Sequence, residues 1–141
     1  MAITIEAYNV FRKALLDGDI DLVNDTLKLA LCTGTYSPDI DADLDYGDIT
    51  NEVANGSGYV TGGAAVTGGA LNQDDSGDSG EFDIDDVVWS SASFTAAKAV
   101  LYDTTVSNKL ICYIDFDGDQ VGDGGNFTVA INASGILSIG E

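Results

Sequence analysis

Four aspartates near the C-terminal end form the best candidate for a metal site in this 141-residue chain. They fall in and just before a glycine-containing loop predicted over 117–126, at Asp115, Asp117, Asp119 and Asp123. Carboxylates spaced in this way can converge on a hard cation such as Ca²⁺. The match to a helical calcium-binding loop is partial, because Gln120 and Asn126 stand where that loop has glycine and glutamate. We assign no metal ligand, and two interpretations stay open, a Ca²⁺ site and a solvated acidic turn.

A second acidic series alternates with apolar residues in the first third of the chain, at Asp39, Asp41, Asp43 and Asp45. In an extended segment, the four carboxylates would share one face and repel one another. Such a face needs solvent, a cation or a basic partner to be stable. We expect a solvated loop, and a basic partner surface is the alternative.

Residues that could support catalysis are scarce. The chain has no histidine, which excludes Ser-His, Cys-His and histidine-ligated zinc chemistry. Glu52 is the one glutamate with apolar neighbours, Val53 and Tyr59, that could tune it as the general acid of a glycosidase. The glycine-rich run 56–63 lacks the Gly-Lys-Ser/Thr end of a phosphate-binding loop. We therefore predict a non-enzymatic protein with no catalytic residue and no cofactor.

The two cysteines, Cys32 and Cys112, lie in apolar, strand-like segments. Two cysteines cannot form a disulfide framework or a four-cysteine zinc site. We expect both to be small buried apolar residues, and a single disulfide is the alternative.

The chain is strongly acidic, with 24 acidic residues, 5 basic residues and a net charge of −19. Such a surface repels phosphate, so we expect neither nucleic acid nor an anionic membrane as a partner. No apolar run approaches the ~18 residues of a membrane span, and the N-terminus has no targeting signal. The sequence predicts a soluble protein made in a cytoplasm.

The N-terminal segment is the one predicted helix, and it must pack on something because it is short. Tyr8, Phe11 and Leu15 recur at three- and four-residue spacings, which predicts a helix over 5–16. Gly18 follows at a position that suits a helix end.

The remainder, residues 26–141, reads as short strands in a single domain that spans 1–141. Residues 26–33 alternate, with Leu27, Leu29 and Leu31 on one face. The runs 94–103 and 110–116 predict a hairpin with Asn108 in its turn. A terminal hairpin is expected from 127–132 and 136–139, and a turn or mobile loop from 72–80.

These elements favour a mainly β fold. About seven or eight short strands recur at roughly ten-residue spacing, which is typical of a β-sandwich or small β-barrel, here with one N-terminal α-helix. No internal repeat or domain linker is visible.

The chain resembles a family of small virion structural proteins of tailed bacteriophages, over nearly its whole length. The segments that carry the resemblance are the helix with Tyr8, Phe11, Leu15 and Leu16, then 18–22, 25–31, 36–39, Glu52-Val53, Gly58-Tyr59 with Gly62-Gly63, Trp89, 99–103, 113–116, 126–129 and 135–137. The resemblance implies a place in the particle and no catalytic residues.

The resemblance leads us to expect a capsid decoration or cement protein that stabilises the head shell in the virion. Its partners would be the major capsid protein or other virion proteins, and it would form a homo-oligomer, with a trimer favoured. The apolar Ile3 and Ile5 need burial, either in the domain or in a partner. The helix or an N-terminal strand that includes them would clamp neighbouring capsid subunits. The alternatives are a neck, tail or fibre component that binds a receptor, and an acidic module that binds a basic host protein.

Overall fold

The computed structural model describes residues 3–140 and confirms a mainly β fold with one α-helix near the N-terminus. The described residues form ten strands, where the sequence predicted seven or eight. In chain order the elements are β1 (Thr4–Ala7), α1 (Asn9–Asp17), β2 (Leu27–Cys32), the 3₁₀ helix η1 (Tyr46–Asp48), β3 (Ala64–Ala65), β4 (Ala70–Asp74), β5 (Ser79–Asp83), β6 (Val87–Trp89), β7 (Thr95–Asp103), β8 (Lys109–Val121), β9 (Phe127–Val129) and β10 (Leu137–Gly140).

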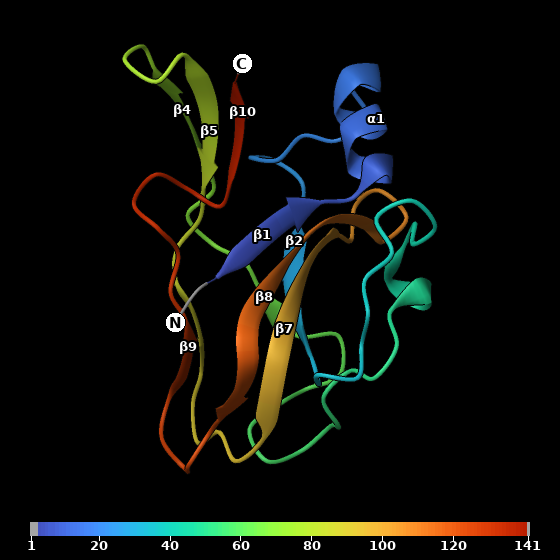
Figure 1. Cartoon of the computed structure of the whole chain (residues 1–141), viewed down its shortest axis with the longest axis vertical. Coiled ribbons are helices and arrows are strands. Elements are labelled where there is room, and N and C mark those ends of the chain that lie inside the picture. Colours follow the sequence, from blue (N-terminus) through green and yellow to red (C-terminus); the bar gives the residue numbers. More distant parts are fainter. Residues whose placement is uncertain (1–2, 141) are drawn as a thin grey trace.

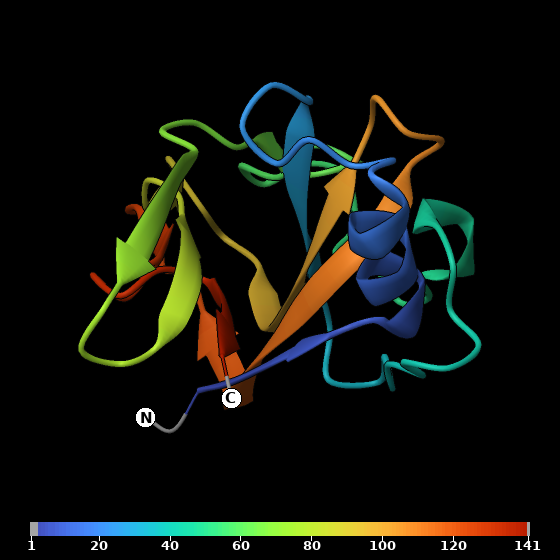
Figure 2. The same cartoon turned by 90° about the horizontal axis from the view of Figure 1, so that it is seen from above.

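The strands form three antiparallel sheets (Figures 1 and 2). The largest has the order β1-β8-β7-β2-β3, the second has the order β10-β5-β4, and β6 pairs with β9. The predicted β7–β8 hairpin is confirmed, and its turn contains Asn108 with φ 56°. Figure 2 shows the β10-β5-β4 sheet to one side of the five-stranded sheet, across from α1.

The main core lies on one face of the five-stranded sheet, under α1 and the two smaller sheets. It takes alternate residues of the central strands, for example Leu29 of β2 and Leu101 of β7, together with Phe11 of α1 and Phe82 of β5. The alternation predicted for 26–33 is confirmed, because Leu27, Leu29 and Leu31 all belong to this core. Each buried leucine of this kind contributes about 1.5–3 kcal/mol.

A second core lies on the opposite face of the same sheet, beneath the loop 33–53. It contains Ala30 and Cys32 of β2, Tyr102 of β7 and Tyr36 of the loop. Cys112 belongs to the main core instead. The sheet therefore separates the two thiols, and both are buried and free, as the sequence favoured.

The predicted helix over 5–16 is wrong at its start. Residues 4–7 form β1, which pairs with β8 in a register that places Ile5 opposite Ile114. The helix begins at Asn9 and ends before Gly18, which adopts φ 76° and donates its N–H to Leu15. The β-branched residues before Ala7 favour a strand, and the edge of β8 offers them backbone partners.

Of two further predictions, one is right in part and one is wrong. The turn or mobile loop predicted over 72–80 is a tight turn at 75–78, in which Asp74 accepts hydrogen bonds from the N–H groups of Ser76 and Gly77, but the flanking residues belong to the β4–β5 hairpin, which was not predicted. The terminal hairpin does not form, because β9 pairs with β6 and β10 pairs with β5. β4 is a polar strand, and the partners of β9 and β10 are distant in the sequence. Patterns over a few residues therefore could not identify these pairings.

Candidate docking groove

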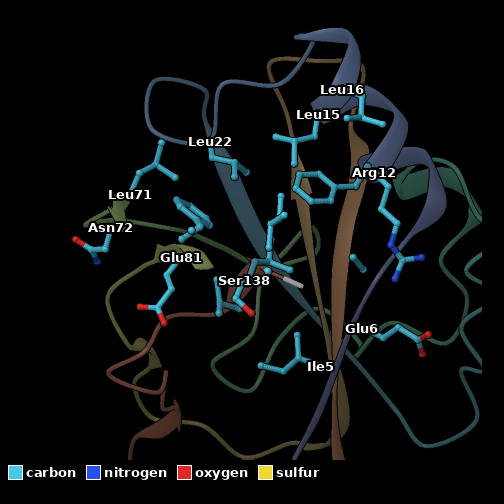
Figure 3. A pocket seen from close by; sticks show the side chains of 18 residues that line it. Ile5, Glu6, Arg12, Leu15, Leu16, Leu22, Leu71, Asn72, Glu81 and Ser138 are labelled. Atoms are coloured by element: carbon cyan, nitrogen blue, oxygen red, sulfur yellow. The ribbon is translucent and has the colours of Figure 1, made fainter. Parts of the chain in front are cut away.

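An open groove of about 880 Å³ lies between α1, β1 and the β10-β5-β4 sheet (Figure 3). In the figure, Leu71 and Glu81 lie on one side of the groove, Arg12 and Leu16 on the other, and Ile5 below. The apolar lining residues are Ile5, Ala7, Phe11, Leu15, Leu16, Leu22, Leu71, Phe82, Ile136, Leu137 and Ile139. This lining is mostly aliphatic and aromatic, which suits an apolar ligand or protein segment.

Cross-strand register explains the apolar wall on the sheet side. Leu71 lies opposite Phe82, and Phe82 lies opposite Leu137. Residues directly opposite one another in antiparallel strands share a face, so these three side chains form one apolar row. The row two residues further on ends in Ile139. Phe82 is buried, whereas Leu71 and Ile139 are each 63% exposed.

The helix side of the groove is amphipathic. Phe11 faces the main core, Leu15 is half-buried against it, and Leu16 is 90% exposed at the mouth. Arg12 supplies a positive charge and donates a hydrogen bond to Asn9 Oδ1 (2.5 Å). Glu6 of β1 accepts a hydrogen bond from the Tyr113 hydroxyl (2.9 Å).

Two sheet edges border the groove. β1 pairs only with β8 and β10 pairs only with β5 among residues 3–140, so each strand has one edge without a strand partner. Consecutive residues of both strands line the groove, namely 5–7 and 137–140. Successive side chains of a strand point to opposite faces, so a cavity that touches all of them follows the strand edge. The groove therefore offers both apolar side chains and backbone hydrogen-bonding groups.

The sequence identified part of this groove. Ile3 and Ile5 were expected to need burial, and they remain 46% and 38% exposed, with Ile5 in the lining. The sheet wall was missed, because 72–80 was predicted as a turn or mobile loop without strands on both sides. The apolar alternation at Leu137 and Ile139 was the available signal, but it was assigned to a terminal hairpin.

The candidate Ca²⁺ residues are only partly brought together. β8 runs on to Val121, so the first half of the predicted loop 117–126 is strand, with a bulge where Asp117 and Gly118 adopt φ 57° and 127°. Asp115 lies 3.9 Å from Lys98 Nζ and accepts a hydrogen bond from the Asp117 N–H. Across residues 3–140, no three acidic, cysteine or histidine side chains are placed to share a metal ion.

The first acidic series forms a loop, as expected, but its carboxylates do not share a face. Asp39 Oδ1 accepts hydrogen bonds from two backbone N–H groups of a turn. Asp43 accepts one from the buried Tyr36 hydroxyl (2.9 Å), and Asp45 caps η1. These contacts use the carboxylates to shape the loop that covers the second core.

Glu52, the candidate general acid, joins three parts of the chain. It accepts hydrogen bonds from the Tyr59 hydroxyl (2.6 Å), the Gly62 N–H (2.7 Å) and the Tyr46 hydroxyl. Burial and the bond to Glu52 raise the pKa of the Tyr59 hydroxyl, which therefore stays a donor. The carboxylate oxygens are occupied by groups of the same chain, an arrangement that holds the glycine-rich segment in place.

Asp103 is a fully buried acidic residue that the sequence did not single out. Its Oδ1 accepts hydrogen bonds from the N–H groups of Thr105 (2.8 Å) and Val106 (3.1 Å), while its buried Oδ2 has no partner. Burial raises the pKa of Asp103 to about 6, and the neighbouring Asp25 carboxyl adds to the rise. A protonated Asp103 avoids placing an unpaired negative charge in the core.

Comparisons of the chain with protein-family models, curated protein sequences and solved structures found no match. Within residues 3–140, no helix has the length and apolar character needed to cross a membrane. The groove and the charge of the chain are the features that bear on its function.

Proposed function

We propose that this chain is a non-enzymatic structural protein of a tailed-phage particle, and that it is a capsid decoration protein which docks on its neighbours through the groove. The major capsid protein is the proposed partner. The chain would act as an oligomer, with a trimer favoured by the symmetry points of a shell.

The observation that carries this proposal is the set of large apolar side chains left open around the groove. Leu16, Leu71 and Ile139 are 90%, 63% and 63% exposed, and they lie on facing walls. Apolar residues scattered singly are ordinary, but a rimmed apolar patch in a concave site is typical of a protein interface. The two unpaired strand edges beside the groove also favour an interface, because a free protein usually covers such edges or places charged residues on them.

The charge supports a position on the outside of a particle. A net charge of −19 opposes contact with packaged nucleic acid. The same charge keeps neighbouring copies soluble before assembly. A decoration protein needs both properties, because it binds a preformed shell from solution.

Quantitative mass spectrometry of purified particles tests the proposal. A decoration protein is expected at a copy number on the order of hundreds, and cryo-EM density for it should lie on the head exterior. A copy number on the order of a dozen or fewer indicates the alternative neck or fibre location. Absence from the particle contradicts a virion role altogether.

One second candidate has an observation in its favour. The net charge of −19 favours an acidic module that binds a basic host protein. Its association would be fast and would weaken steeply as salt increases. Capture of a basic host protein in a salt-sensitive manner, with no copies in the particle, would favour this function over decoration.

A further inference from the structure

We propose that the groove takes up an extended strand of a partner protein, which pairs with the free edge of β10 and carries basic residues beside its apolar ones. This inference rests on the proposed docking function and specifies the chemistry of the docked segment. The partner is a different protein and not a second copy of this chain.

The course of the groove along β10 supports strand addition. All four residues of β10 line the groove, and the strand hydrogen-bonds on its other side to β5. An added strand would extend the β10-β5-β4 sheet into the space beside α1 and β1 (Figure 3). In this recognition mode the main chain supplies hydrogen bonds and alternate side chains enter pockets.

Gly80 leaves room for such a side chain. It lies on β5 opposite both Ile139 and Gln73, in the row next to Phe82. A Cβ built at Gly80 meets no atom within 4 Å, and its backbone does not require positive φ. The sheet face is therefore hollow at this point, between Phe82 and the exposed Ile139.

The negative charge of the chain favours a basic partner in the groove. Glu81 and the cation Arg12 lie on the groove walls, whereas the Glu6 carboxylate is bound to the Tyr113 hydroxyl on the other face of the sheet. The preference for a basic partner therefore comes from Glu81 and from the net charge of −19. Three of the other four basic residues of the chain form ion pairs elsewhere, at Lys13–Asp17, Lys98–Asp115 and Lys109–Asp19. A second copy in this groove would bring another net charge of −19 against Glu81, so we assign the groove to a different protein and any contact between copies to another face.

A peptide titration tests the inference with the full chain. The probe is a short fluorescent peptide of alternating valine and lysine, measured by anisotropy at about 0.15 M salt. One control peptide carries N-methyl groups on every second residue, which removes N–H donors from one edge without changing its charge. A second control replaces lysine with glutamate.

Two protein variants complete the design. Gly80→Trp fills the hollow, and the matched control Gly125→Trp places the same side chain at another exposed glycine with free space around it. Thermal unfolding of both variants establishes that they fold. We expect at least about tenfold weaker binding for the N-methylated peptide and for Gly80→Trp, no binding of the glutamate peptide, and wild-type binding for Gly125→Trp.

Equal binding of the methylated and unmethylated peptides would overturn strand addition, because only charge would then hold the peptide. Failure of the unmodified peptide to bind would overturn it as well. A dimer of the chain that Gly80→Trp disrupts would replace the basic partner by a second copy. If the peptide does not bind but Gly80→Trp still lowers incorporation of the chain into particles, the docking function is supported and strand addition is wrong. If the peptide binds but purified particles lack the chain, strand addition is supported and the virion role is wrong.

Discussion

Gly80 of β5 lies directly opposite Ile139 of β10, and the isoleucine side chain remains 63% exposed beside the space that the glycine leaves. A well-packed sheet face would place a large side chain at the glycine position and cover its neighbour. This pair instead presents an apolar side chain next to a hollow, on the wall of a groove that two strand edges border. We interpret the combination as a surface built to be covered by another protein.

Ile139→Ser separates docking from folding. Because the side chain is mostly solvated, we expect the free energy of unfolding to change by no more than about 0.5–1 kcal/mol. Binding of the partner should weaken by about tenfold, because the apolar contact is lost. Val121→Ser is the matched control, since Val121 is 71% exposed on β8 and outside the groove. Equal binding by both variants would contradict the role of the groove.

Phe82→Ala gives the opposite pattern. Phe82 is buried in the main core at the base of the groove wall. Truncation leaves a cavity, and we expect a loss of about 3–5 kcal/mol in the free energy of unfolding, measured by urea denaturation. A loss below about 1 kcal/mol would show that this sheet is not packed on the core as described.

The raised pKa of the buried Asp103 predicts a pH dependence of stability. The folded pKa of Asp103 is raised from 3.8 to about 6, so its contribution is fully present below about pH 4 and is lost as the pH rises through 6. Asp103→Asn keeps the Oδ1 acceptor for Thr105 and Val106 and removes the charge. We expect this variant to be more stable at pH 7, by about 2 kcal/mol, and unchanged near pH 4.

Thermal unfolding of Asp103→Asn between pH 4 and 7 measures this effect. Asp123→Asn, at an exposed position, serves as the control for loss of one negative charge. If Asp103→Asn has the same pH profile of stability as the wild type, the pKa of Asp103 is not raised by burial.

The Tyr59 hydroxyl is expected to contribute measurably to stability. It donates to Glu52 and accepts from the Leu31 N–H (3.0 Å) while fully buried. Tyr59→Phe leaves a buried N–H without its partner and should cost about 1–3 kcal/mol. Tyr113→Phe, which removes a single half-buried bond to Glu6, should cost less. A reversed order would contradict the anchoring role of Glu52.

Stability should not depend on reducing agents. Cys32 and Cys112 lie in cores on opposite faces of one sheet, and burial raises the pKa of each thiol to about 12. Equal melting temperatures with and without dithiothreitol, and slow thiol labelling of the native protein, are expected. Rapid labelling of either thiol under native conditions would show that its core opens.

Local patterns in the sequence predicted the central sheet well. The alternation around Leu29 and the β-prone runs on both sides of Asn108 identify these strands, and the leucine face of residues 26–33 is the face of the main core. The second core on the opposite face was not predicted, because it depends on the loop 33–53 that covers it. The groove wall was harder, because β4 is polar and mostly exposed and β10 pairs with a strand more than fifty residues away. The boundary between β1 and α1 was predicted wrongly, because Ile5 fits either the apolar stripe of a helix or a strand. Pairing with the edge of β8 is what makes this segment a strand.

The acidic residues show a different limit. Their spacing suggested either a cation site or a shared face, yet Asp39 and Asp45 shape turns and Asp115 lies near Lys98. Which carboxylate caps a turn depends on backbone geometry that residue spacing does not specify. The burial of Asp103 was not predicted for a similar reason, because it depends on the segments that pack around this residue.

Cryo-EM of the particle at side-chain resolution would show whether the groove binds a neighbouring protein. We expect density for this chain on the head exterior, with a strand of a neighbouring protein lying along β10 and an apolar side chain over Gly80. A bound chain whose groove is open to solvent, with the contact on another face, would contradict it.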